Sequence, residues 1–273
     1  MLGYHRNTET TLMSNQWSLT NDLPLLESGE VQIWRIDLAD IDRIGIFSSA
    51  LNAEEQAIAN RRRSGRTRDH FTVGRACLRR LLGNALDVSP VQITITEGPQ
   101  GKPEIKGSTL QFNVAHSKDT ILIALARNNP IGVDVEYLDR PTDLMDVAQA
   151  NFTEDETASL QAITGQTARR KLFYTYWTRK EAIVKADGRG LLLPLASFEV
   201  SGSSMERHPV IVRESSGEEG KTYFLSDLDL GDYAVGALAL QSSECTVRRL
   251  IFPLASIDAF GLQKPDRHNN GRN

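Results

Sequence analysis

The chain has 273 residues, which is enough to bury a sizeable core in one or two domains. Its composition, 40% hydrophobic and 24% charged, is that of an ordinary globular protein. The net charge of −4 argues against bulk nucleic acid as the main partner, while leaving room for a local basic patch. The two cysteines, Cys77 and Cys245, have no spacing typical of a disulfide framework or a zinc site, so we expect a reducing, cytoplasmic location.

The two ends of the chain are predicted to lie outside the folded part. Residues 1–30 contain no apolar run long enough for a signal peptide or a membrane span, and we expect a mobile leader there. Residues 261–273 are polar and contain glycine and proline, which indicates a disordered tail. The folded part is therefore expected between 31 and 260, with no membrane contact.

The first half of the folded part begins with a predicted strand at 31–38, where apolar residues fall on alternating positions. Asn52, followed three residues later by Glu55, has the form of a capping box and predicts a helix start. A second helix is expected to start at 67, because its apolar side chains recur on one helical face. The members of that face are Phe71, Leu78, Leu81, Leu82 and Leu86. The strands that complete this half are 91–98, 110–115 and 120–126. The last strand is apolar on both faces, which indicates a central position in a sheet.

The second half repeats this order of elements. A strand is predicted at 131–137, a capping box runs from Thr153 to Glu156, and a long helix follows at 167–188. The two capping boxes are separated by 101 residues, and so are the expected starts of the two long helices, 67 and 168. The halves share order and spacing but little side-chain identity. Further antiparallel strands are expected at 196–201, 208–214, 221–240 and 245–252.

This repeat predicts an α+β fold of two similar α/β half-domains in a pseudo-twofold arrangement, residues 31–130 and 131–260. The cleft between the halves is the default place for a functional site. An internal duplication removes one reason to form a dimer, so we expect a monomer.

Two acids, Asp134 and Glu136, lie within the predicted strand at 131–137. Side chains alternate along a strand, so both acids share one face and Val133 and Val135 share the other. Burial of one unpaired charge already costs several kcal/mol, on the order of the whole stability of a small domain. The acids therefore either face water or grip a divalent cation.

A stripe on the second long helix bears on that choice. Trp177, Glu181 and Lys185 are spaced i, i+4 and i+8 on one helical face. A surface pair of Glu181 with Lys185 would contribute only about 0.3–0.5 kcal/mol. If the helix packs on the strand, however, Glu181 completes a three-carboxylate site of the kind that suits Mg²⁺, with Mn²⁺ as a substitute.

A third cluster lies between Gly101 and Asp119. Lys102 is in a turn before one strand, and His116 and Ser117 follow the end of another. Such residues are often turn-forming or solvent-facing, but beside a metal they are typical donors for a phosphorylated ligand. The basic segment 61–75 is the local positive patch, and its plain alternative is a solvated helix junction.

Three sequence blocks, FNVAHS, GVDVE and WTRKEAIVKADGRGL, occur in this order after a GKP turn. Together they resemble the signature blocks of the Sfp-type 4′-phosphopantetheinyl transferases, over about residues 31–200. The resemblance implies a pseudo-dimer of two α/β halves with coenzyme A and Mg²⁺ between them. It also implies the reaction: the phosphopantetheine arm of coenzyme A moves to a serine of a carrier protein, releasing adenosine 3′,5′-bisphosphate.

The resemblance also implies roles for individual residues. Asp134, Glu136 and Glu181 would hold Mg²⁺ against the pyrophosphate, and Glu181 would take the serine proton directly or through a metal-bound water. Lys185 would stabilise charge on the pyrophosphate. The nucleotide's 3′-phosphate would be held by Lys102 and His116, with Ser117 as a further donor.

The chain departs from the family pattern in two places. Ala115 stands where the common motif has a serine, so a hydroxyl donor to the nucleotide is missing. Glu55 and Ile58 stand where some members have phosphate-binding lysines. The residues that could replace those lysines are Arg61, Arg68 and Arg75.

Two other functions compete with the transferase hypothesis. A metal-dependent nuclease or nucleotidyl transferase would need a long basic groove, which the acidic net charge disfavours. A catalytically silent carrier-binding module would be expected to lack a metal ligand or the helix lysine, and all are present. By resemblance the carrier contacts 137–152, while the identity of the carrier, of fatty acid, polyketide or nonribosomal peptide synthesis, stays open.

Overall fold

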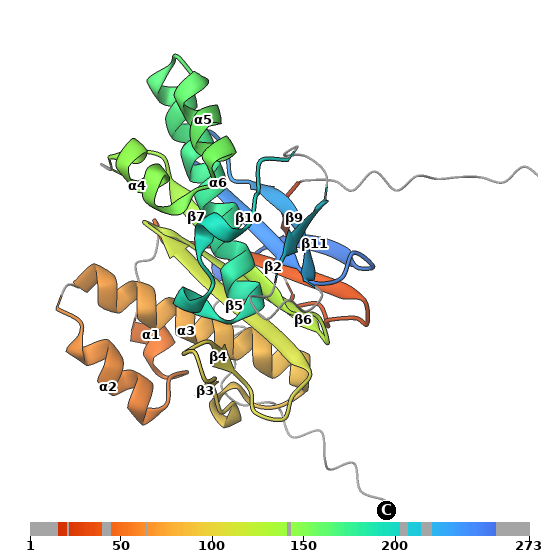
Figure 1. Ribbon diagram of the computed structural model, residues 1–273. Coiled ribbons are helices and arrows are strands. Elements are labelled where there is room, and N and C mark those ends of the chain that lie inside the picture. Colours follow the sequence, from red (N-terminus) through yellow and green to blue (C-terminus); the bar gives the residue numbers. More distant parts are fainter. Residues whose placement is uncertain are drawn as a thin grey trace, which may run out of the picture.

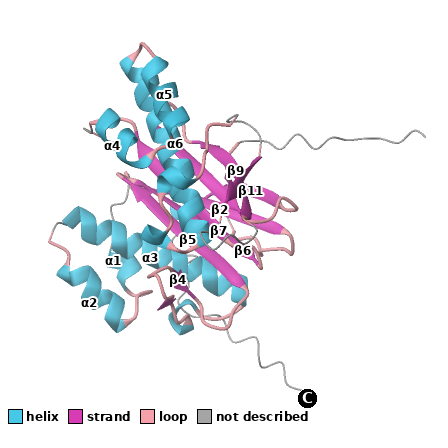
Figure 2. Cartoon of the chain, viewed as in Figure 1, coloured by secondary structure: helices cyan, strands magenta, loops and turns pink. Residues whose placement is uncertain are grey.

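The computed structural model describes residues 16–20, 22–39, 45–63, 65–140, 143–202, 207–213 and 220–254. Strands form the middle of the molecule, and helices cover them on two sides (Figure 1). Figure 2 shows this division in the same view, with the strands in one central block. The helices are α1 (Gly45–Ser48), α2 (Ala53–Arg61), α3 (Gly65–Leu86), α4 (Leu144–Asn151), α5 (Glu154–Ala162) and α6 (Gln166–Asp187).

The strands form two main sheets and one small hairpin. A five-stranded sheet has the order β1-β11-β2-β6-β5, and a four-stranded sheet has the order β7-β10-β9-β8. The strand predicted to be central, β6, does lie inside its sheet between β2 and β5. The strands of the larger sheet are β1 (Ser18–Leu19), β2 (Glu30–Asp37), β5 (Leu110–Ser117), β6 (Thr120–Arg127) and β11 (Thr246–Ile251). Those of the smaller sheet are β7 (Ile131–Tyr137), β8 (His208–Val212), β9 (Lys221–Asp229) and β10 (Ala234–Leu240), and the hairpin pairs β3 (Thr96–Glu97) with β4 (Pro103–Glu104).

Three buried apolar clusters hold these layers together. One packs α3 against the outer face of the larger sheet, and a second packs α6 against the outer face of the smaller sheet. The third joins the two sheets and includes Ile33, Leu122, Val133 and Val135. Alternation along β7 thus sends its valines between the sheets, which leaves Asp134 on the side that α6 covers.

The predicted internal repeat is confirmed at the level of whole elements. Helices α2 and α5 have nine residues each, and α3 and α6 have 22 each. Both pairs are displaced by the same 101 residues, and the strand order β2-β6-β5 corresponds to β7-β10-β9. Both predicted capping boxes are present, at Asn52 and at Thr153. The chain therefore has two similar halves in one α+β fold.

A buried ion pair is repeated with the same displacement. The capping-box acid Glu55 pairs with Arg79 of α3 at 2.6 Å, and the capping-box acid Glu156 pairs with Lys180 of α6 at 2.8 Å. Both cations have fully buried side chains. A buried charge needs a counter-charge and hydrogen bonds, so each pair ties a short helix to the long helix of its half.

Two predicted strands are replaced wholly or mostly by other structure, and these cations supply the reason. The 3-10 turn Pro90–Gln92 overlaps the start of 91–98, which keeps only two strand residues, because Arg79 donates to the carbonyls of Pro90 and Ile93. The 3-10 turn Leu195–Ser197 overlaps the start of 196–201, and Lys180 donates to the carbonyls of Leu195 and Phe198. A third 3-10 turn, Gly190–Leu192, follows α6. Helix α4 was not predicted.

Both ends of the described chain contact the larger sheet. Strand β1, in the predicted leader, pairs with β11, and Leu26 is buried. Trp17, just before β1, donates to the carbonyl of Asp229 in β9 of the smaller sheet at 2.5 Å. Strand β11, assigned to the second half by sequence, pairs in parallel with β1 and β2 of the larger sheet. The predicted tail, 261–273, lies outside the described residues.

Candidate functional site

Helix α6 lies directly on β7 because residue 132 is a glycine. A Cβ at Gly132 would fall 2.0 Å from the Ala182 carbonyl oxygen and 2.5 Å from the Ala186 nitrogen, both in α6. Any side chain there would push the helix away from the strand. Gly132 therefore brings the helix stripe over the acidic strand, and the sequence analysis did not single it out.

Asp134 is the buried acid of this strand. Its Oδ1 accepts a hydrogen bond from Lys185 Nζ at 2.6 Å. Its Oδ2 is also buried, and no group among the described residues donates to it. Burial raises the pKa of Asp134 to about 6, with smaller contributions from Glu181 and Glu136 and an opposing one from Lys185. A buried oxygen without a donor is the feature that a hard cation satisfies.

Glu136 has a partner for each oxygen. Arg140 Nη1 donates to Oε1 at 2.7 Å, and Ser117 Oγ donates to Oε2 at 2.9 Å. Glu181 acts electrostatically on Asp134, so its carboxylate lies within range of the strand. Within the described part of the chain, no three acids, histidines or cysteines form a ready-made metal cluster. The donor set nevertheless fits Mg²⁺, which needs only one or two protein carboxylates besides waters and substrate phosphates.

The stripe on α6 lines a cleft that we call the carboxylate cleft. Trp177, Glu181 and Lys185 all line it, as their helical spacing predicts. Lys102 enters from the first half and donates to the carbonyls of Ile131 and Ala186, at 3.2 and 3.5 Å. Burial lowers the pKa of Lys102 to about 8, and Asp187 opposes this shift only in part.

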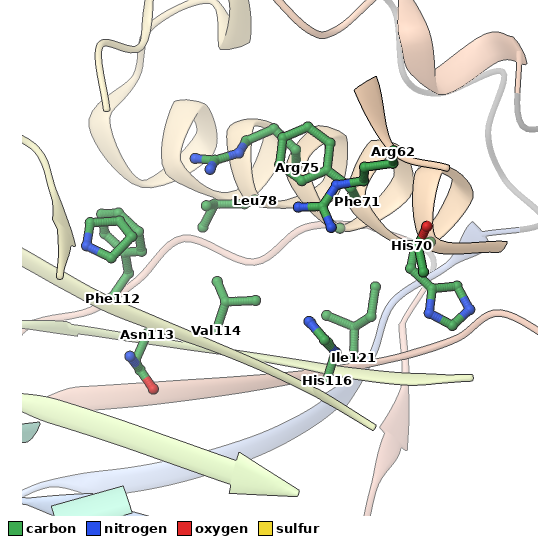
Figure 3. A pocket seen from close by; sticks show the side chains of 13 residues that line it. Arg62, His70, Phe71, Arg75, Leu78, Phe112, Asn113, Val114, His116 and Ile121 are labelled. Atoms are coloured by element: carbon green, nitrogen blue, oxygen red, sulfur yellow. The ribbon is translucent and has the colours of Figure 1, made fainter. Parts of the chain in front are cut away.

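Beside this cleft, between α3 and β5, lies a pocket that we call the basic pocket (Figure 3). Arg62 and Arg75 lie over the Phe71 ring, with guanidinium carbons 4.6 and 5.6 Å from its centre. His116 approaches from the strand, and His70 from the helix. Partial burial lowers the pKa of His116, and nearby His70, Lys185 and Arg62 lower it further.

The two cavities are adjacent, because Pro103, Asn113 and Val114 line both of them. A cationic pocket beside a cleft that is lined by Glu181 and two lysines suits an elongated anion. One end of such a ligand would meet arginine and histidine, and a more central phosphate would meet lysine and a metal.

Adjacent residues at the end of β5 face different sides. His116 lines the basic pocket, whereas Ser117 is buried, lines neither cavity and donates to Glu136. Ala115 lies in the apolar cluster between the sheets. The structure therefore brings His116 to the pocket and directs Ser117 to the acidic strand.

Of the three arginines proposed for the nucleotide, only Arg75 lines the basic pocket. Arg61 is exposed, and Arg68 lies beside Asp69 at 3.8 Å on another part of α3. Glu55 completes the capping box of α2 and forms an ion pair with Arg79. The pocket is also lined by residues that were not predicted from the sequence, Arg62, His70 and Phe71. For Phe71 and His70, their place on one helical face with Arg75 was the available signal.

The sequence profile of the 4′-phosphopantetheinyl transferase superfamily matches residues 130–238, which hold the acidic strand and the α6 stripe. The chain is 36% identical to the 4′-phosphopantetheinyl transferase HetI of Nostoc sp., over 61% of this chain and 72% of HetI. The chain belongs to the 4′-phosphopantetheinyl transferase superfamily. The resemblance inferred from FNVAHS, GVDVE and WTRKEA is thereby confirmed.

The chain is also similar to two other bacterial proteins. A 4′-phosphopantetheinyl transferase of Bacillus subtilis is 31% identical over 56% of this chain and 66% of its own length. The 4′-phosphopantetheinyl transferase gsp of Aneurinibacillus migulanus is 26% identical over 75% of this chain and 83% of its own length. Among the described helices of this superfamily member, none is long and apolar enough to cross a membrane.

Proposed function

We propose that the chain transfers the 4′-phosphopantetheine arm of coenzyme A to a serine of an apo carrier protein, with Mg²⁺ and release of adenosine 3′,5′-bisphosphate. Family membership supports the reaction and its two substrates. The structural observation that carries the metal-dependent form is Asp134 Oδ2, a buried carboxylate oxygen without a donor beside Lys185. Lys185, which donates to the other oxygen of Asp134, lines the carboxylate cleft.

The basic pocket is proposed to hold the nucleotide end of coenzyme A. Arg62, Arg75 and His116 face a cavity large enough for a phosphate group, at about 210 Å³. Arginine binds phosphate oxygens through paired N–H groups, which favours it over lysine for a terminal phosphate. Lys102 lines the cleft next to Pro103, which lines both cavities, and it would supply a further positive charge.

The carboxylate cleft is proposed to hold the pyrophosphate. Asp134, Glu136 and Glu181 would hold Mg²⁺, with Mn²⁺ as a substitute. When bound, the cation supplies neutralisation of charge on the phosphate oxygens, which is the main need in phosphoryl transfer. Lys185 already places a positive charge at Asp134 and adds to that neutralisation.

Glu181 is proposed to accept the proton of the carrier serine. The serine oxygen then forms a bond to the pantetheine-side phosphorus, and the bond from that phosphorus to the bridging oxygen breaks. Adenosine 3′,5′-bisphosphate leaves with the bridging oxygen, whose developing charge Lys185 stabilises. Glu181 lies on the same helix face as Lys185, so both line the cleft in which this exchange would occur.

The carrier is proposed to bind beside the acidic strand, over 137–152. This stretch includes α4, which follows β7 and ends at the cleft residue Asn151. An acyl or peptidyl carrier would place its serine next to Glu181 from this side. We further propose a monomer in the cytoplasm that acts without nucleic acid or membrane.

Mass spectrometry of an apo carrier protein tests the proposal. The carrier is incubated with the chain, coenzyme A and Mg²⁺, and a mass gain of one phosphopantetheine is expected. A carrier whose modified serine is replaced by alanine is the matched control and should gain nothing. An unchanged carrier mass across several carriers would reject the transferase reaction, and a full gain after exhaustive chelation would reject the metal.

A further inference from the structure

Strands β5 and β7 are neighbours from different sheets, and side chains join them. Asn113 Oδ1 accepts from the Val133 backbone N–H at 2.9 Å, and Ser117 Oγ accepts from the Tyr137 backbone N–H at 3.3 Å. The two contacts are four residues apart on each strand, so they keep one register. Two buried side chains of the first half therefore fix the acidic strand of the second half.

Ser117 uses two of its three hydrogen-bonding directions in contacts with the acidic strand. A hydroxyl has one proton to donate and two lone pairs to accept. The proton goes to Glu136 Oε2 at 2.9 Å, and one lone pair accepts from Tyr137. Because Ser117 is only 6% exposed, water does not compete for these bonds. The side chain is thus locked, and it holds one Glu136 oxygen in place.

Glu136 keeps room for a cation while it is held. An ionised carboxylate has about four lone-pair positions. Ser117 and Arg140 each use one, on different oxygens. A ligating carboxylate is normally oriented by a hydrogen bond of this kind from outside the metal's own ligands.

We propose that Ser117 is a positioning residue that orients Glu136 toward the divalent cation, rather than a donor to the nucleotide. The inference rests on the proposed function and adds a role to it. Its neighbour His116 provides the contrast, since His116 lines the basic pocket and Ser117 does not. Asn113 supports the same arrangement, because it fixes Val133, whose carbonyl accepts from Lys185 Nζ at 3.2 Å.

Calorimetric titration of Mg²⁺ into the protein with coenzyme A, without carrier, tests this role without turnover. Ser117→Ala should raise the Kd for Mg²⁺ about 10- to 100-fold, the usual effect of losing such a partner. The affinity for coenzyme A measured in chelator should not change. Ser117→Thr keeps the hydroxyl and should restore the wild-type Kd.

Ser108→Ala is the matched control. Its hydroxyl accepts from the Leu110 backbone N–H at 3.1 Å, at the opposite end of β5 from Ser117. This variant should bind Mg²⁺ like the wild type. In a Glu136→Gln background, Ser117→Ala should cause no further loss, because its effect passes through that carboxylate.

Each other result has a definite meaning. An unchanged Mg²⁺ Kd in Ser117→Ala would reject the positioning role, and a weakened coenzyme A affinity in chelator would show that Ser117 contacts the ligand instead. If the alanine variant does not fold, Ser117→Cys retains the shape with a weaker donor, and a wild-type Kd there would reject the role. If the wild type itself binds no Mg²⁺ with coenzyme A, the proposed function fails and not this inference alone.

Discussion

Helices α3 and α6 present the same six helix positions to two different cavities. The positions on α3 line the basic pocket, and the positions 101 residues later on α6 line a second cavity against β9 and β10. The two sets are Thr67, His70, Phe71, Gly74, Arg75 and Leu78, and Ala168, Lys171, Leu172, Thr175, Tyr176 and Arg179. The internal repeat thus gives the fold two cavities at equivalent positions, the basic pocket and the second cavity.

The charges in the two cavities differ. In the second cavity, Arg179 binds Asp227 through two hydrogen bonds of 2.8 and 2.9 Å, and Asp229 adds another acid to the wall. In the basic pocket, Arg62 lies over an aromatic ring rather than against an acid. The basic pocket therefore has arginines and histidines but no acid among the described residues of its wall, whereas the second cavity combines Lys171 and Arg179 with Asp227 and Asp229. Equivalent backbone geometry thus does not imply an equivalent site.

The two helices differ in the opposite sense at the positions of the α6 stripe. Trp177, Glu181 and Lys185 of α6 line the carboxylate cleft, and the equivalent α3 residues are Ala76, Arg80 and Asn84. In the proposed function, one half would supply the cations for a nucleotide, and the other would supply the acid, lysine and acidic strand for the chemistry. Four experiments probe the residues of the two halves.

The largest effect is expected at Glu181. Glu181→Gln keeps the size of the side chain but removes the base, so turnover should fall about 10²- to 10⁴-fold while coenzyme A still binds. Arg80→Gln changes the equivalent position of α3 and should leave turnover within about twofold of wild type. Rates come from the carrier mass gain, and affinities from calorimetry. Equal rates for both variants would place the base elsewhere.

The next effect concerns the repeated ion pairs. Glu156→Ala leaves Lys180 buried and unpaired, which should lower the free energy of unfolding by about 3–5 kcal/mol. Glu55→Ala should lower it less, because Glu55 keeps slight exposure and Glu156 also accepts from the Val200 N–H. Urea unfolding measures both, with exposed Glu154→Ala as the control at about 0.5 kcal/mol or less. A larger loss at Glu55 would contradict this order.

A smaller effect, on the affinity for coenzyme A, is expected when a cation is removed from the basic pocket. Arg62→Gln should weaken coenzyme A binding about tenfold, or about 1.4 kcal/mol, and less at high salt. Lys171→Gln removes a cation from the second cavity and should leave the affinity unchanged. Calorimetric titration of coenzyme A into both variants at two ionic strengths measures these affinities. A loss at Lys171 equal to that at Arg62 would show that both cavities bind anions.

The smallest effect is a pH dependence of stability at Lys102. Its pKa is about 8 in the folded chain and 10.5 as the ordinary value, so the unfolded chain binds more protons between these pH values. Stability without ligand should therefore rise with pH through that window, and Lys102→Met should lose this rise. At pH 7 the methionine variant should be more stable by about 1 kcal/mol, or about 2–4 °C in Tm, while binding coenzyme A more weakly. Lys106→Met, at an exposed position nearby, is the control. A wild-type pH profile in Lys102→Met would contradict the shift.

Local signals in the sequence predicted much of the fold. The capping boxes at Asn52 and Thr153 and the bounds of 131–137 were correct, because caps and strand alternation are decided by neighbours in the chain. The stripe from Trp177 to Lys185 also follows from helical spacing alone. These features need no knowledge of the tertiary structure.

The missed features depend on distant contacts. Residues 91–98 have the alternation of a strand, but Arg79 binds the backbone carbonyls there. Arg61 and Arg62 are adjacent, and only the extended backbone at the helix end, with φ −73° and ψ 128° at Arg62, decides which one faces Phe71. The need for glycine at 132 can be seen only once α6 is known to pack on that residue. Tertiary packing thus selects among candidates that the sequence leaves equal.

Strand β11 has a consequence for how the protein is made. It pairs with β2 from Thr246 opposite Glu30 to Ile251 opposite Arg35, so partners some 216 residues apart must meet. During synthesis, β2 leaves the ribosome long before β11 exists. Its unpaired edge can then pair with other chains, which promotes aggregation. Such distant pairing also slows folding, because a large loop must close first. Residues 31–130 made alone would therefore be a poor independent fragment, although they contain an entire copy of the repeat.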